Sequence, residues 1–522
     1  MPGFPRRYTR AAFAVVILCT AGAVVGSYAT AGANLADTQS GTGPAGPSYG
    51  DVPIPTDDGA PQAPAAAPAT APNGSTTPET RLNRSRLDGA GNLTVVATQG
   101  FYVSDEEAEL VAFDREGEVV YYDAGYRVYF DVDPVPGTRA TVEYLASRHL
   151  EGAACTETPR CTYNVVRRVN LTTGEGHTVY GEVTPRIYSA RWHDVDRIND
   201  THLVIADIVR DSVRIVDTTD NETTWSWHAS EAFDRSAGGQ DGDWTHVNDV
   251  EVLEDGRVMV SVRNMDQVLF LDPGEGVQEG WTLGAENDYD VLYEQHNPDY
   301  VPPAEGGPAI TVADSENGRV LEYQRVDPET GEPTTGPDGE WRRTWGWRDA
   351  RLQWPRDADR LPNGNTLVVD THGDRVVEVA PNGSVVWSRT VGMPYDAERL
   401  GTGDESTGGP STYAAPGAPP VDGSGAGPFA GVLSEPDSRT VVTRPDANVD
   451  QTVWTTLKDL TPSLVVNGLL YAGPSWMRFS DLVFSLVALV TAACWGVAEL
   501  CWSPVAPLAY VRALRRRVAR LN

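Results

Sequence analysis

Residues 244–272, WTHVNDVEVLEDGRVMVSVRNMDQVLFLD, contain the pattern on which the fold prediction rests. The first part alternates between polar and apolar positions, so His246 and Asn248 share one side of a strand. Asp255 and Gly256 form a hairpin turn signal, and a second apolar strand follows it. A third apolar strand completes the stretch, and Trp281, after the turn at Gly274, begins a fourth. Four strands joined by turns are typical of one propeller blade.

The same pattern recurs along the chain with no helical periodicity. The other five units occupy residues 93–123, 129–182, 191–229, 294–347 and 353–392. A repeat of roughly 40 to 60 residues predicts a propeller. The alternative is a β-sandwich made from the same hairpins, but sandwiches lack a tandem repeat. We therefore predict an all-β, six-bladed β-propeller with a transmembrane helix at each end of the chain.

The composition is strongly acidic. The 522 residues carry a formal net charge of −32, and Lys458 is the single lysine among 41 basic residues. Such a charge repels nucleic acid and anionic lipid, so we expect no nucleic-acid partner. Dispersed acids with almost no lysine favour a halophilic source, where a carboxylate surface stays hydrated. The alternative is an ordinary acidic secreted protein.

The changes in composition divide the chain into segments with different expected roles. Ala11 to Ala33 and Phe479 to Trp502 are apolar runs long enough to cross a bilayer. The predicted segments are a signal or anchor segment (1–33), a disordered Pro/Ala/Gly linker (34–90), the propeller (91–392), an acidic Gly/Pro-rich linker (393–475), a transmembrane helix (476–502) and a basic tail (503–522).

Arginines flank both apolar runs on the side of the chain termini. Arg6, Arg7 and Arg10 precede the first run, and a cluster of arginines follows the second. The positive-inside rule places both ends in the cytoplasm, so we expect the propeller on the extracellular side of the cell membrane. Small residues near Ala31 also allow cleavage as a signal peptide. The sequence leaves that alternative open.

Two further features fit an extracellular propeller. Cys155 and Cys161 flank a short loop, and a disulfide between them is plausible in an oxidising compartment, with two free thiols as the alternative. Glycosylation sequons lie between the two apolar runs. They start at Asn73, Asn83, Asn92, Asn170, Asn199, Asn221 and Asn382.

The opening strand of each unit lines the central channel of a propeller, so equivalent positions converge there. Alignment of the units gives one shared position, occupied by Phe130, His193, Asn248, His296 and Arg356. His246 lies two residues before Asn248 and therefore on the same face. An Asp or Asn follows each shared position, and blade-to-blade hydrogen bonding is its expected role, with the side chain directed away from the channel.

A second set of equivalent positions follows the second strands. It contains Arg263 and Thr371. The combined set is a cationic pocket of histidines and arginines inside an anionic protein, which suits a tetrahedral oxyanion such as sulfate. One imidazole can act as a nucleophile while its neighbours stabilise charge on the transferred group. Three histidines also suit a divalent metal, but Arg263 beside them would repel it, so we expect no metal and no cofactor.

Four motifs resemble the arylsulfotransferase family, whose members use no nucleotide sulfate donor. They are WHDVD at His193, THVND at His246, SVRN at Arg263 and QHNPD at His296. The similarity suggests a membrane-anchored member of haloarchaeal type. It implies sulfuryl transfer from an aryl sulfate ester to a phenolic acceptor through a sulfohistidine.

By this resemblance His296 is the nucleophile. His193, His246 and Arg263 would hold the sulfate oxygens and assist proton transfer, while Asn248, Thr371 and Arg356 would bind substrate. The C-terminal anchor departs from the soluble exported members, and Arg356 replaces another polar residue expected in the last blade. Two alternatives remain: a non-catalytic surface propeller for ligand binding or signalling, and a quinone- or metal-dependent propeller enzyme.

Overall fold

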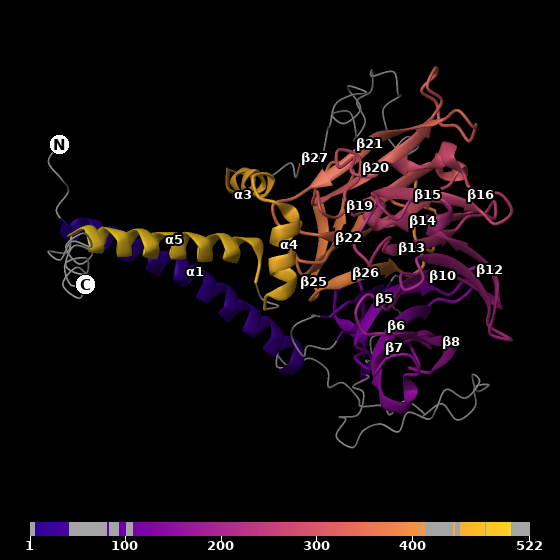
Figure 1. Cartoon of the computed structure of the whole chain (residues 1–522), viewed down its shortest axis with the longest axis horizontal. Helices are drawn as coiled ribbons and strands as arrows, with labels where there is room; N and C mark the ends of the chain where they lie inside the picture. Colours follow the sequence, from indigo (N-terminus) through magenta and orange to yellow (C-terminus); the bar gives the residue numbers. More distant parts are fainter. Residues whose placement is uncertain are drawn as a thin grey trace, which may run out of the picture. The chain divides into compact units, whose positions relative to one another are not determined.

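Six antiparallel sheets form the blades of a β-propeller, which confirms the predicted fold class. Their innermost strands contact one another in a closed ring, in the order β5, β9, β13, β18, β22, β26 and back to β5. The computed structural model describes residues 6–40, 81–82, 93–100, 108–406, 408–412, 442–443, 449–474 and 477–502. Contacts within the chain separate two units, the helix pair α1 and α5 and the propeller with α3 and α4. Figure 1 shows both units.

The strands of each blade follow one another from the channel to the rim. Blades two to four contain β5 (Val128–Pro134), β6 (Thr141–Glu151), β7 (Arg160–Asn170) and β8 (Gly176–Pro185); β9 (Trp192–Arg197), β10 (His202–Asp207), β11 (Ser212–Asp217) and β12 (Glu222–His228); β13 (Val247–Val252), β14 (Val258–Val262), β15 (Gln267–Asp272), β16 (Gly276–Val277) and β17 (Leu283–Gly284). Blades five and six contain β18 (His296–Val301), β19 (Ala309–Asp314), β20 (Arg319–Val326), β21 (Glu340–Arg348) and β27 (Val442–Thr443); β22 (Pro355–Arg360), β23 (Thr366–Asp370), β24 (Arg375–Val379) and β25 (Val385–Thr390).

The first blade closes the ring by joining both ends of the repeat region. Its sheet contains β26 (Pro394–Arg399), β2 (Thr94–Thr98), β3 (Leu110–Phe113), β4 (Val119–Asp123) and β1 (Arg81–Leu82). The innermost strand β26 lies beyond residue 392, where the sequence analysis ended the propeller. The boundary was too early because the first repeat supplies only the outer strands, and its inner strand comes from the other end of the chain.

Carboxylates compensate for the unpaired edge of each innermost strand. An inner strand has no hydrogen-bonded neighbour on its channel side, so some backbone N–H groups lack ladder partners. Val250 N donates to Asp194 Oδ2 of the preceding blade at 2.7 Å, and Val132 N donates to Asp396 Oδ2 at 2.7 Å. Ala397 N likewise donates to Asp357 Oδ2 at 3.2 Å. The expected blade-to-blade hydrogen bonds are therefore present.

Apolar side chains fill the spaces within and between neighbouring blades. Val204 and Trp227 of the third blade share one buried cluster with Val260 of the fourth blade. Trp345 and Trp347 of β21 similarly pack against β23 and β24 of the next blade. Each blade thereby buries apolar surface against its neighbours, and the ring holds the inner strands in fixed register.

Two helices occur in the stretch that was expected to be a linker. Lys458 of α3 (Val449–Asp459) donates from Nζ to Leu352 O at 2.7 Å. Asn467 of α4 (Ser463–Ala472) is buried and donates from Nδ2 to Glu316 Oε2 at 3.0 Å. Residues 393–475 thus include ordered parts of the propeller unit.

The second unit is an antiparallel helix pair. Helices α1 (Arg6–Ser40) and α5 (Phe479–Trp502) lie side by side in Figure 1, and both are long and apolar enough to cross a membrane. Arg6 Nη1 donates to Trp502 O at 3.2 Å, so the start of α1 meets the end of α5. The rings of Phe13 and Trp495 stack with centroids 6.1 Å apart.

Candidate active site

A β-bulge at the start of each inner strand sets the direction of the side chains at the channel. One residue is skipped in the pairing of the first two strands, and such a bulge redirects its side chain. The skipped residues are Phe130, His193, Asn248, Arg356 and Tyr395. In the fifth blade the skipped residues are Asn297 and Pro298, directly after His296. In five blades the bulge therefore occupies the position aligned in the sequence, with Tyr395 as a new member, and in the fifth blade it directly follows that position.

The backbone before this position is strained in four blades. His246, Glu294, Trp354 and Met393 have positive φ values of 48°, 46°, 56° and 48°. Each lies two residues before its aligned side chain. Left-handed backbone at residues other than glycine costs free energy and tends to occur at functional sites. This shared turn leads the chain into the bulge.

His296 is fully buried and has a defined tautomer. Its Nδ1 lies 3.1 Å from Glu294 O and 2.8 Å from Ser315 Oγ. The Ser315 hydroxyl donates to Pro355 O at 2.7 Å, so neither oxygen partner can donate a proton to His296. Nδ1 must therefore carry the hydrogen, and Nε2 keeps its lone pair. Burial and the charges of Arg356 and Arg263 hold the pKa of His296 well below its usual value.

Arg356 faces that lone pair. Its Nη1 contacts His296 Nε2, and its guanidinium stacks 3.9 Å from the Trp354 ring centre and 5.0 Å from that of Tyr395. Among the described residues no carboxylate pairs with Arg356, which is 5% exposed. Burial lowers the pKa of Arg356 to about 10. A buried cation without a counter-ion is a binding site for an anion.

His246 forms a carboxylate–imidazole pair. Its Nδ1 lies 2.7 Å from Asp243 Oδ1, so Nδ1 donates and Nε2 is the free base. Burial acts to raise the pKa of Asp243, but His246 outweighs it and holds that pKa at about 2. Burial and Arg263 lower the pKa of His246, while Asp243 acts to raise it.

His193 completes the group of imidazoles. Its ring stacks on Phe130 with centroids 4.6 Å apart and meets the His246 ring edge at 4.8 Å. Tyr395 lies between the histidines, with its ring centre 6.3 Å from His193 and 6.2 Å from His296. Burial and His246 hold the pKa of His193 well below its usual value. All three predicted histidines therefore converge as neutral imidazoles.

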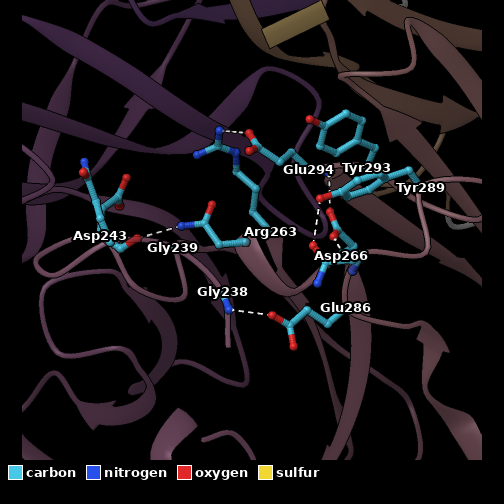
Figure 2. A pocket seen from close by; sticks show the side chains of 12 residues that line it. Gly238, Gly239, Asp243, Arg263, Asp266, Glu286, Tyr289, Tyr293 and Glu294 are labelled. Atoms are coloured by element: carbon cyan, nitrogen blue, oxygen red, sulfur yellow. Dashed lines mark hydrogen bonds and ion pairs between the residues drawn. The ribbon is translucent and has the colours of Figure 1, made fainter. Parts of the chain in front are cut away.

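Arg263 lies on the short turn after β14 and borders an open pocket. Its Nη2 forms an ion pair with Glu294 Oε2, as Figure 2 shows. The pocket is lined by both residues, by Asp243 and by the tyrosine pair Tyr289 and Tyr293, whose rings stack at 4.0 Å. Because Asp243 contacts His246 and Glu294 contacts His296, this pocket adjoins the imidazoles.

Asn248 and Thr371 lie at the predicted places, but both donate hydrogen bonds to backbone carbonyl groups of the propeller. Asn248 Nδ2 donates to Gln295 O at 2.9 Å, and its Oδ1 has no partner within the described part of the chain. The Thr371 hydroxyl donates to Pro394 O at 2.8 Å, next to Tyr395. In this arrangement Thr371 holds the closing strand β26 and has no proton left for a sulfate oxygen.

Helix α4, which contains none of the sequence motifs, contacts residues next to Arg356. Its Asn467 accepts a hydrogen bond from Gln353 Nε2, close in sequence to Arg356. Its Tyr471 ring meets the Trp354 ring edge with centroids 5.8 Å apart. Trp354 thus lies between the guanidinium of Arg356 and the aromatic face of α4.

The predicted cysteine pair lies away from these residues. Cys155 and Cys161 are joined by a disulfide at the end of the hairpin β6–β7, with Cα atoms 5.5 Å apart. The described free cysteines, Cys19, Cys494 and Cys501, lie in the apolar helices. The disulfide therefore belongs to the β6–β7 hairpin of the second blade and not to the candidate site.

The electrostatics of the site favour an anionic ligand over a metal ion. Both nitrogens of His296 are occupied, and Arg263 and Arg356 lie close enough to depress the histidine pKa values. A divalent cation would meet two guanidinium groups there. Planar donors and neutral imidazoles around one space instead suit a sulfate or sulfuryl group.

Comparison with known families supports the same chemistry. Residues 80–298 match one arylsulfotransferase (ASST) family model, and residues 206–392 match a second. The two matches overlap and together cover residues 80–392. This match supports aryl sulfotransferase activity in general and small aryl donors and acceptors. No curated protein matches the chain.

Three solved structures show distant likeness to this chain. A protein of unknown function from Bacteroides caccae is 10% identical with a TM-score of 0.40, covering 60% of this chain and 99% of the other. A periplasmic gluconolactonase from Pseudomonas aeruginosa is 14% identical with a TM-score of 0.36, covering 59% and 99%. Virginiamycin B lyase from Staphylococcus aureus is 8% identical with a TM-score of 0.31, covering 62% and 88%. Likeness at this level does not bear on activity.

Proposed function

We propose that the protein transfers a sulfuryl group from an aryl sulfate ester to a phenolic acceptor through a sulfohistidine on His296. The main support is the contact between the buried, unpaired guanidinium of Arg356 and Nε2 of His296. The guanidinium can bind the donor sulfate by two parallel hydrogen bonds. The sulfur then lies beside Nε2, the ring nitrogen of His296 that carries the lone pair.

In the first half-reaction His296 Nε2 attacks the sulfur of the donor. The S–N bond forms, the bond between sulfur and the aryl oxygen breaks, and its electron pair leaves on the phenolate. Arg356 moves from the lone pair to the sulfate oxygens, where it stabilises the charge of the transferred group. Arg263, beside the open pocket, offsets the charge of the leaving phenolate.

In the second half-reaction the acceptor phenol attacks the sulfur of the sulfohistidine. The new S–O bond forms, and the electron pair of the S–N bond returns to Nε2 of His296. The phenolic proton passes to Nε2 of His246, whose other nitrogen is held by Asp243 at 2.7 Å. His246 gives this proton to the next leaving phenolate, so the cycle balances without a cofactor.

The aryl ring of the substrate has an aromatic surface to pack against. Tyr289 and Tyr293 form an aromatic wall against which the donor or acceptor ring packs.

We infer that the helix pair of α1 and α5 anchors the protein in the cell membrane with the propeller outside. The antiparallel pairing supports this inference, because the start of α1 meets the end of α5, and these are the two helix ends next to which the sequence is basic.

The function is tested with p-nitrophenyl sulfate as donor and phenol as acceptor in high-salt buffer. The full-length protein should release nitrophenol, and release should accelerate with phenol concentration. Mass spectrometry of protein treated with donor alone should find the peptide containing His296 heavier by one sulfuryl group. A folded protein that binds the donor but yields neither product nor a labelled peptide would overturn the proposal.

Asp243→Asn should lower kcat about 10- to 100-fold and shift the acidic limb of the pH profile to lower pH. The reaction needs neutral His246, whose pKa is already below the ordinary value of about 6.5. The wild-type rate should therefore hold down to about pH 6.5 and fall only below it. Loss of the Asp243 carboxylate lowers the His246 pKa further and weakens the base. Measurement of kcat/KM against pH tests both effects.

Asp241→Asn provides the matched control, because Asp241 lies on the same loop and is exposed. This variant should keep the wild-type rate and pH profile. An Asp243→Asn enzyme with an unchanged rate, or with its acidic limb moved to higher pH, would show that His246 is not the base.

A further inference from the structure

Two rings of carboxylates line the channel beyond the histidines. The inner strands repeat an acid, any residue and a second acid, which places both acids on one face of each strand. The pairs are Asp131 and Asp133, Asp194 and Asp196, Asp249 and Glu251, Asp357 and Asp359, and Asp396 and Glu398. The fifth blade contributes Asp299 alone. Acids of different blades interact electrostatically, so these carboxylates lie near one another around the ring of inner strands.

Backbone donors stabilise several of these carboxylates, but none in the described part of the chain reaches Asp359. Asp196 and Glu251 accept from the next inner strand at 2.6 Å and 2.7 Å, like the acids already described. Asp359 is 1% exposed, and among the described residues no donor reaches either of its carboxylate oxygens. Burial holds the pKa of Asp359 well above its usual value, so the ionised carboxylate is costly unless a cation lies beside it.

The segment after β26 brings a further acid to Asp359. Oxygens of Asp299, Asp359 and Glu405 lie within 4.8 Å of one another. Ser406 Oγ donates to Asp299 Oδ2 at 2.7 Å and fixes its orientation. Glu405 has a positive φ of 48°, so a strained backbone holds it at this place.

We propose that Asp299, Asp359 and Glu405 bind a divalent, oxygen-preferring cation of the calcium class. Calcium binds oxygen ligands at about 2.3 to 2.6 Å, so opposite ligands of one ion lie about 5 Å apart. The three carboxylates fit that spacing, and all are hard oxygen donors. Among the described residues the group contains no nitrogen or sulfur ligand, and zinc prefers such ligands, so the group does not suit zinc.

The ion ties together parts of the chain that are distant in sequence. Asp299 lies on β18, Asp359 on β22 and Glu405 after the closing strand β26. Binding therefore joins two blades to the segment that follows ring closure. Because the ion binds the folded ring and not the unfolded chain, it stabilises the propeller. This inference does not depend on the proposed sulfuryl transfer.

The test measures metal content and thermal unfolding of the full-length protein in detergent. After chelator treatment and dialysis, calcium chloride should raise Tm by about 5 °C or more, and potassium chloride at equal ionic strength should not. Plasma mass spectrometry of calcium-loaded, desalted protein should find one ion per chain. The absence of a calcium-dependent rise in Tm, or a rise with potassium alone, would overturn the proposal.

The variant Asp359→Asn tests whether Asp359 binds the metal ion or has a structural role only. The variant should need at least about tenfold more calcium for half of the Tm shift. Its metal-free form should be as stable as metal-free wild type or more stable, because one repulsive charge is gone. Asp338→Asn, which changes an exposed acid, should respond to calcium like wild type. A calcium response that Asp359→Asn leaves intact would exclude this site.

Discussion

His296→Ala should lower kcat/KM for transfer from p-nitrophenyl sulfate to phenol by about 10⁴-fold or more. The ring provides the atom that bonds to sulfur, and no neighbour replaces it. Nε2 of His246 is the proton acceptor, and His193 lies stacked on Phe130. Stopped-flow release of nitrophenol would measure the remaining rate, and the labelled peptide should disappear with it.

The control is His228→Ala, because His228 is exposed on the outer strand β12. This variant should keep the wild-type rate and the labelled peptide. Labelling that persists on another histidine in His296→Ala, at a rate near that of wild type, would assign the nucleophile to that residue. Tm values of both variants show that the comparison is made on folded protein.

The fold could be predicted because each blade repeats the same local pattern. Alternation, turn residues and the tandem spacing depend on neighbouring residues only. Closure depends on contact between distant parts of the chain, so the pairing of β26 with β2 was missed. A signal was present, since Pro394-Tyr395-Asp396-Ala397 repeats the form of Pro355-Arg356-Asp357-Ala358.

The same logic explains which site residues the sequence supplied. The aligned positions were found because a bulge recurs in each blade, at the aligned residue or, in the fifth blade, directly after His296. Asp243 and Glu294 lie on loops before the strands, where no repeat pattern identifies them. Tyr471 comes from α4, whose contact with Trp354 depends on tertiary structure alone. The catalytic roles remain predictions that the substitutions test.

The acids of the inner strands share one sequence pattern but have two different roles. Each acid after an aligned position was expected to bridge blades, and Asp194 and Asp357 do so, as does Asp396 after Tyr395. Asp359 is the second acid of the same pair in β22, but no donor among the described residues reaches it. Which acid remains without a partner depends on the register between blades, and local sequence does not encode that register.

Arg356→Met should have opposite effects on activity and stability. Loss of the guanidinium removes the donor that binds the sulfate oxygens, so kcat/KM should fall about 10²- to 10³-fold. The fall in the Arg356 pKa from 12.5 to about 10 corresponds to roughly 3 kcal/mol against the buried charge. Methionine removes that cost, and we expect a free energy of unfolding about 1 to 3 kcal/mol higher. Urea unfolding and steady-state kinetics measure the two effects.

Arg360→Met is the matched control on the same strand. Arg360 is equally buried, but its Nη2 pairs with Glu322 Oε2 at 2.7 Å. Its loss leaves Glu322 buried without a counter-ion and should cost about 3 to 5 kcal/mol, while the folded fraction keeps its activity. Sulfate should raise the Tm of Arg360→Met more than that of Arg356→Met. Destabilisation by both substitutions to the same degree would mean that Arg356 has a counter-ion and is not held open for an anionic substrate.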